Sequence, residues 1–87
     1  MLTIFILDNI DKNLKKTLKL TCQAVNSKIY VGCISARIRE EIWQEIEQNN
    51  SIRDATIIHA VQNHVIVKTK GTQKVQAFDL VDLIKIK

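Results

Sequence analysis

The sequence predicts an α+β domain in which two helices cover one face of a mainly antiparallel sheet. Two segments carry apolar residues at helical spacing, and several short segments are rich in β-branched residues or alternate between apolar and polar side chains. Short polar turns separate the later strands, as in antiparallel sheets. Because the 87 residues include no proline and only two glycines, we expect no linker and a single domain over residues 1–87.

The first third of the chain predicts a strand and a basic helix. Leu2 to Leu7 is almost continuously apolar, as in a central strand covered on both faces, and stops at Asp8-Asn9. Asp11 is placed to cap a helix from Lys12 to about Ala24. One face of this helix is apolar, with Leu14, Leu18, Thr21, Cys22 and Val25. Another face is basic, with Lys12, Lys15, Lys16 and Lys19.

The middle third predicts a second strand and a second helix. Lys28 to Ile34 alternates and is β-branched, and Ser35 follows as a helix cap. The buried stripe of this helix is formed by Ile38, Ile42, Trp43 and Ile46, and the helix ends before Asn49-Asn50-Ser51.

The last third predicts three further strands. Ala55 to Val61 and Val65 to Thr69 form a β-hairpin around a short polar turn at residues 62–64. We expect a loop from Gly71 to Gln76 and a last strand from Leu80 to Ile86. The order β-α-β-α-β-β-β fits a ferredoxin-like fold best, although periodicity does not give the strict βαββαβ order.

Composition narrows the function without deciding it. The net charge of +4 is compatible with nucleic acid but does not require it. With no secretory leader and no apolar run near the ~20 residues that span a bilayer, we expect a cytoplasmic protein without membrane contact. Cys22 and Cys33 are interpreted as reduced, mostly buried thiols, and His59 and His64 as strand and turn residues. No phosphate-binding glycine loop or nucleophile with its base is found, which disfavours an ordinary small-molecule enzyme.

The second helix has an unfavourable charge order. Arg37 and Arg39 lie in its first turn and glutamates follow, whereas a helix dipole favours the reverse. Two guanidinium groups beside free backbone N–H groups would bind a phosphate well. The alternative is that both arginines pair with Glu40, Glu41 or nearby carboxylates, and the pattern alone favours neither.

Three further groups are candidates for binding or chemistry. The four lysines of the first helix could bind a DNA backbone, although such a stripe is often only a solvated face. Lys68, Lys70 and Lys74 gather around the loop at Gly71. Asp8 ends the first strand and could face its copy across a dimer axis to hold a divalent metal, although a turn or capping role is more common.

Two known families have tracts like part of this sequence. Ile29 to Ser35 (IYVGCIS) resembles the first strand of an RNA-recognition motif, but a strand and a helix precede it and Val65 to Lys70 lacks the expected aromatics. This RNA-binding interpretation stays a remote alternative. Tyr30 to Ile46 (YVGCISARIREEIWQEI) resembles the type I-E branch of the Cas-two family far more closely. The likeness extends to Asp8-Asn9, the hairpin, Thr69 to Gly71, a basic loop and Asp79-Leu80.

The resemblance implies a role in antiviral defence. Such proteins are ferredoxin-like homodimers held between dimers of the large CRISPR integrase subunit (Cas-one), and the complex captures short DNA duplexes as new spacers. In this adaptation step the small subunit is a non-catalytic centre, and strand transfer belongs to the large one. The residues that match its DNA-binding positions are Lys15, Arg37, Arg39 and Lys74.

Two points stay open after the resemblance. Asn13 and Val75 stand where the family has further basic residues, so the grip on DNA could be weaker, or could shift in part to Lys12, Lys16 and Lys70. Other members of the wider family are Mg²⁺- or Mn²⁺-dependent endonucleases, and Asp8 matches their metal-binding acidic residue. Whether this chain is an enzyme is therefore undecided, with an endonuclease centred on paired Asp8 as the alternative.

Overall fold

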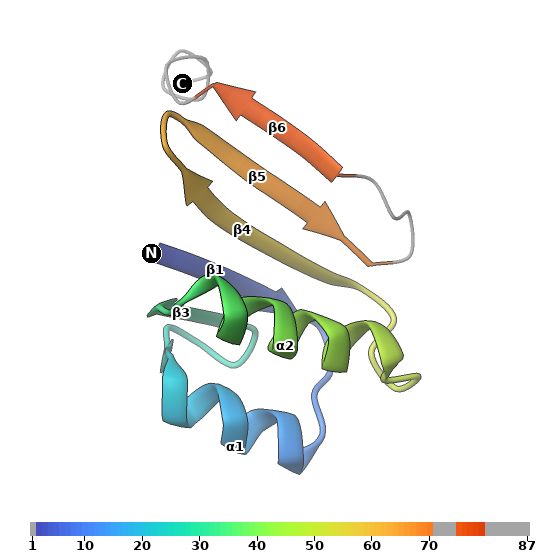
Figure 1. Ribbon diagram of the computed structural model, residues 1–87. Helices are drawn as coiled ribbons and strands as arrows, with labels where there is room; N and C mark the ends of the chain where they lie inside the picture. The colour runs from blue at the N-terminus through green and yellow to red at the C-terminus, as the bar shows by residue number, and fades with distance from the viewer. Residues whose placement is uncertain (1, 71–74, 80–87) are drawn as a thin grey trace.

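The computed structural model describes residues 2–70 and the strand at residues 75–79 (Figure 1). The elements, in chain order, are β1 (Leu2–Leu7), α1 (Lys12–Thr21), β2 (Gln23–Ala24), β3 (Ile29–Cys33), α2 (Ala36–Gln48), β4 (Ala55–Val61), β5 (His64–Thr69) and β6 (Val75–Asp79). The strands form one sheet in the order β2-β3-β1-β4-β5-β6, and all neighbours are antiparallel. The α+β class and the antiparallel sheet are confirmed.

The short strand β2 completes a ferredoxin-like order. With it, the elements from β1 to β4 follow the order βαββαβ, which periodicity alone does not give. The expected helix to Ala24 is too long, because Cys22 has extended backbone angles and its N–H closes the helix on the Leu18 carbonyl oxygen at 2.7 Å. Gln23 and Ala24 then pair with β3.

A glycine permits the close approach of β3 to the end of α1. A Cβ atom built on Gly32 would lie 2.8 Å from both the Cys22 Sγ and the Thr21 carbonyl oxygen. Any side chain at position 32 would therefore push this corner apart, which explains why glycine stands in the middle of a strand.

Both predicted helix caps are confirmed. Asp11 Oδ1 accepts a hydrogen bond from the Leu14 N–H at 2.8 Å, and Ser35 Oγ accepts one from the Ile38 N–H at 3.2 Å. Asp11 Oδ2 also accepts from Asn49 Nδ2 at 2.8 Å, which ties the start of α1 to the end of α2. The hydrogen bond from the Leu14 N–H, and then that from Asn49, hold the pKa of Asp11 below its usual value.

The core lies between the helices and one face of the sheet. Its fully buried members include Phe5, Leu14, Leu18, Ile46 and Ile57, which come from both helices and from β1 and β4. No described helix or strand covers the opposite face, where Leu2 and Ile6 of β1 are 50% and 38% exposed. Within the described residues, the expectation that β1 is covered on both faces is therefore not met.

The later strands differ in detail from the prediction. The β4–β5 hairpin is present, but its turn is two residues, Gln62 and Asn63, and β5 begins at His64. Gln62 has a φ of 54°, the left-handed conformation that tight hairpins require. β6 starts at Val75, inside the expected loop, because its register continues the β5 ladder from Lys68 to His64. The expected strand from Leu80 to Ile86 lies outside the described residues.

Candidate nucleic-acid interface

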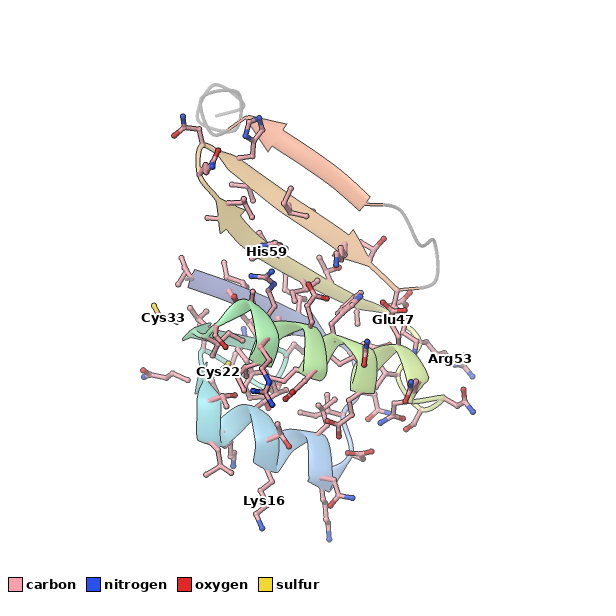
Figure 2. All side chains as sticks on the ribbon, viewed as in Figure 1. Lys16, Cys22, Cys33, Glu47, Arg53 and His59 are labelled. Carbon is pink, nitrogen blue, oxygen red and sulfur yellow. The ribbon has the colours of Figure 1, made fainter. Side chains whose placement is uncertain are left out.

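The exposed face of α1 is basic. Lys12, Lys15, Lys16 and Lys19 are all exposed, while Leu14 and Leu18 anchor the opposite face in the core. Within residues 2–70 none of the four lysines forms an ion pair. Figure 2 shows Lys16 pointing away from the body of the molecule. The face thus presents uncompensated positive charge, as a phosphate backbone requires.

Shallow concavities border this face. The four lysines and Leu20 line one of about 340 Å³, and Lys15 and Lys19 also line a neighbouring one of about 330 Å³ with Tyr30 and the segment that precedes β3. Leu20 is 79% exposed and Val25 is 64% exposed, so apolar surface lies beside the lysines. Lysine stems can cover such surface while their ammonium groups stay in water.

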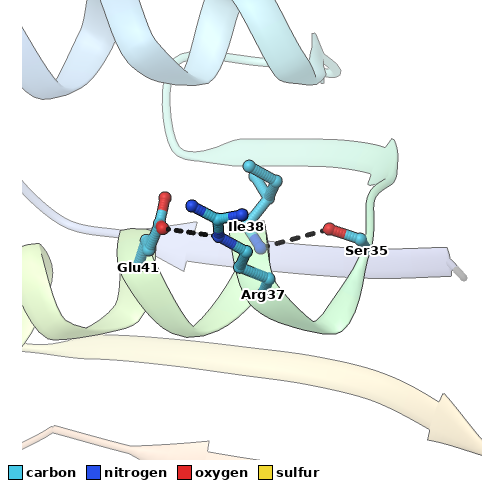
Figure 3. Close-up of polar contacts among 4 residues, drawn as sticks. All are labelled: Ser35, Arg37, Ile38 and Glu41. Atoms are coloured by element: carbon cyan, nitrogen blue, oxygen red, sulfur yellow. Dashed lines mark hydrogen bonds and ion pairs between the residues drawn. The ribbon is translucent and has the colours of Figure 1, made fainter.

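Arg37 lies at the exposed start of α2. Its side chain is 86% exposed, and its Nε donates to Glu41 Oε1 at 3.2 Å, one turn further along the helix (Figure 3). Exposed pairs of this kind contribute little stability, about 0.3–0.5 kcal/mol. Glu41 therefore holds Arg37 only weakly, and a phosphate could replace it.

Arg39 lies on the other side of the same helix. Two helical positions are about 200° apart, so the two arginines face opposite directions. Arg39 is buried, with 7% of its surface exposed, and its Nε lies 3.6 Å from Glu40 Oε1. The two guanidinium groups therefore do not lie together, and each of them is paired with a glutamate on α2.

The lysines near β5 have different surroundings. Lys70 Nζ donates to the Ile46 and Asn49 carbonyl oxygens at 2.8 and 2.6 Å, so it caps the end of α2. Lys68 Nζ lies 3.5 Å from Glu40 Oε1. Lys74 lies outside the described residues. The Lys70 ammonium group therefore already has hydrogen-bond partners within the fold. The sequence did not indicate this role.

Asp8 shares a pocket with a second carboxylate. The pocket measures about 250 Å³ and is lined by Asp8, Asp54, Lys28 and neighbours in β1 and β4. The Asp8 N–H donates to the Asp54 carbonyl oxygen at 3.4 Å. Two carboxylates suit Mg²⁺ or Mn²⁺, but among the described residues no group of three metal-binding side chains is present. A metal here would need further ligands from water or another chain.

Several residues near Arg39 were not predicted to form a cluster. His59 lies on β4, as predicted for a strand residue, but it is buried beside Arg39, with Thr3 opposite it on β1. Burial, and then the positive charges of Arg39 and Lys68, hold the pKa of His59 below its usual value. A sequence signal existed, because Arg39 precedes Ile42, Trp43 and Ile46 at the spacing of one buried helix face.

The cysteines are less enclosed than expected. Both are free thiols, but Cys22 is half-buried and Cys33 is exposed. Cys33 lies at the end of β3 opposite the exposed Leu2, and it therefore belongs to the uncovered face of the sheet.

The comparisons with known proteins identify the family. A family model described as CRISPR-associated protein (Cas_Cas2CT1978) matches residues 2–83. The chain belongs to this Cas2 family. The match spans both helices and all the strands that the structure describes, and it favours a CRISPR-associated role over the RNA-recognition motif. None of the curated proteins matches the chain. In the described residues of this Cas2 protein, no helix has the length and apolar character needed to cross a membrane.

Proposed function

We propose that this Cas2 protein acts in CRISPR spacer acquisition as a type I-E central dimer. In this role it bridges copies of the large integrase subunit and grips the backbone of a captured DNA duplex, while strand transfer belongs to the large subunit. The observation that carries the proposal is the lysine face of α1, since four exposed cations that have no carboxylate partner in the part of the chain that the structure describes suit phosphate contacts.

The dimensions of this face fit a nucleic-acid backbone. From Lys12 to Lys19 the helix rises by about 10 Å, and phosphates follow one another along each DNA strand at roughly 3.4 Å of helix axis. The lysines can therefore meet two or three consecutive phosphates of one strand. Arg37 would extend the contact to α2 once its pair with Glu41 opens. Lysine contacts carry no base readout, so binding should be independent of sequence.

The uncovered sheet face supports a dimer. Apolar side chains of β1, β3, β4 and β5 lie on this face, opposite the helices, and Leu2 and Ile6 are the most exposed of its large ones. Two such faces can pack against each other in a sheet-on-sheet arrangement about 10 Å thick. Dimerisation would bury these side chains and give the complex a two-fold symmetric centre, which suits a symmetric duplex.

Duplex binding at several salt concentrations tests the lysine face. Lys15→Gln with Lys19→Gln should weaken binding of a labelled duplex about tenfold and reduce the salt slope by roughly two, as for two lost phosphate contacts. The matched control is Lys28→Gln with Arg53→Gln, which removes the same charge from exposed positions outside α1. Equal losses in both double variants would mean that only net charge matters, against a defined DNA-binding face.

An integration assay tests the role itself. A short duplex, a CRISPR-array plasmid and the cognate large subunit are mixed with the wild-type protein or a variant. Insertion should fail with the α1 double variant and persist with Asp8→Asn. Insertion that requires Asp8 and tolerates the lysine changes would contradict the scaffold role.

The pocket at Asp8 favours a second candidate function, a metal-dependent endonuclease. Asp8 and Asp54 line it together, and a bound Mg²⁺ or Mn²⁺ would activate water or stabilise a scissile phosphate. Cleavage of labelled DNA and RNA should then disappear in both Asp8→Asn and Asp54→Asn, together with Mn²⁺ binding measured by loss of the free-ion spin-resonance signal. Cleavage that persists in these variants would come from a contaminant.

A further inference from the structure

The space between α2 and the sheet holds a cluster of buried polar groups without hydrogen bonds. In the described structure, Nε and Nη1 of Arg39, both ring nitrogens of His59 and the Thr3 hydroxyl are buried and have no hydrogen-bond partner. Arg39 is 7% exposed, His59 5% and Thr3 0%. Figure 2 shows His59 between the sheet and α2. Unpartnered buried polar groups are unfavourable, so a cluster of five such atoms requires an explanation.

The charges of the cluster are not balanced. Arg39 and Lys68 contribute two positive charges, and Glu40 is the carboxylate that lies between them, at 3.6 Å from Arg39 Nε and 3.5 Å from Lys68 Nζ. Both distances exceed the 2.7–2.9 Å that is usual for a charged hydrogen bond. Glu40 thus screens the two cations but leaves the buried donors of Arg39 without a hydrogen bond.

Access to the cluster passes through its two outer members. The side chain of Glu40 is 46% exposed and that of Lys68 is 27% exposed, whereas that of Arg39 is 8% exposed. Because Glu40 is half in solvent, it can turn outward without leaving a charge buried. This movement would open a route to the Arg39 guanidinium from the side of β5.

We infer that Arg39, Lys68 and His59 form a binding site for one phosphate group, whose place Glu40 occupies when the site is empty. Donors from α2, β4 and β5 converge there, and a tetrahedral oxyanion can accept from all three. Nε and Nη1 of Arg39 would donate as a pair, Lys68 would donate from the rim, and the His59 ring N–H would donate from below.

The inference deepens the proposed function at one position, Arg39. It rests on the proposed function only for the source of the phosphate. The source is either inorganic phosphate or a phosphate of nucleic acid, since both present the same oxygens. The exposed lysines of α1 lie on another element and grip the backbone independently of this site.

Binding of inorganic phosphate tests the site directly. Calorimetric titration at constant ionic strength, with chloride as the balancing anion, should show phosphate binding that Glu40→Gln strengthens by about tenfold, because the competing carboxylate is gone. Lys68→Gln should weaken it by about the same factor, and Arg39→Gln should abolish it. If Arg39→Gln does not fold, the variants of Glu40 and Lys68, whose side chains are more exposed, still decide the question.

Matched controls lie at exposed positions outside the cluster. Arg53→Gln and Glu45→Gln make the same charge changes there, and they should leave phosphate affinity unchanged. Equal effects of Glu40→Gln and Glu45→Gln would mean that only net charge matters and would overturn the inference. Absence of phosphate binding to Glu40→Gln would overturn it as well.

Competition identifies the source of the phosphate. A labelled duplex is mixed with phosphate or chloride at equal ionic strength. If phosphate displaces the duplex more than chloride does, and only while Arg39 is present, the site binds the DNA backbone. Phosphate binding without displacement assigns it to free phosphate, and the site stands in either case. Failure of the duplex-holding role would appear separately, in the α1 lysine variants.

Discussion

Lys70 offers the clearest separation of a structural lysine from a DNA-binding one. Its ammonium group donates to two carbonyl oxygens at the end of α2, those of Ile46 and Asn49, at 2.8 and 2.6 Å. These oxygens lie at the end of the helix, where the dipole is negative and intrahelical donors are missing. Lys70→Met keeps most of the apolar stem and removes only the charge and its hydrogen bonds.

The expected loss of stability follows from those two bonds. A hydrogen bond to a charged group contributes about 1.5–3 kcal/mol, and because both bonds come from one partly exposed ammonium group, we expect the two together to contribute about as much as one such bond, roughly 2 kcal/mol. For a domain of this size each kcal/mol shifts Tm by about 4–8 °C, which gives a decrease of about 8–16 °C. The expected loss of roughly 2 kcal/mol is a large share of the ~5–15 kcal/mol that stabilises a typical domain.

Urea denaturation and duplex binding together test this reasoning. Lys70→Met should lower the urea midpoint but, at a temperature where it is folded, bind duplex DNA like the wild type. Lys16→Met is the matched control: this exposed lysine of α1 should weaken duplex binding and leave the midpoint unchanged. A Lys70→Met protein of normal stability and reduced duplex affinity would refute the capping role and restore Lys70 to the DNA interface.

Three other predictions concern the fold, the histidine and the open face. Gly32→Ala should cost about 1–3 kcal/mol in urea denaturation, because the new methyl group meets backbone at 2.8 Å. Because the pKa of His59 is lowered in the folded state, its contribution to stability is complete above pH 6.5 and is lost as the pH falls toward the folded-state pKa. His59→Gln should remove this part of the pH dependence of the urea midpoint, whereas His64→Gln should retain it. Ile6→Lys should turn a dimer into a folded monomer in analytical ultracentrifugation, and a dimer that persists would exclude the uncovered face as its interface.

The sequence predicted well wherever a pattern is local. β1, α2, the β4–β5 hairpin and both helix caps follow from hydrophobic periodicity and capping residues, which act within a few positions. β2 was missed because residues 22–24 continue the helical pattern of α1, and only pairing with the distant β3 makes them extended. Its two residues are too few to produce a strand signal of their own.

The candidate site was only partly predictable for a similar reason. The lysine face of α1 follows from helical spacing and is present as expected. Helical spacing also implies that Arg37 and Arg39 point in opposite directions. The prediction instead gave more weight to their shared place in the first turn of α2. The capping contact of Lys70 and the proximity of Arg39 to His59 depend on tertiary packing across β4 and β5, which no local pattern encodes.

The central position of β1 has a consequence for how the chain acquires its fold. This strand pairs with β3 and with β4. Because Thr3 lies opposite His59, the ribosome adds the β4 partner more than fifty residues after β1. At ribosomal rates of about 5–20 residues per second, roughly 3–11 s pass between the synthesis of β1 and that of β4. During this interval an apolar segment, LTIFIL, has one edge without its strand partner, and such segments are prone to intermolecular β-pairing. The fold therefore makes its first strand a part of the nascent chain that needs protection from aggregation.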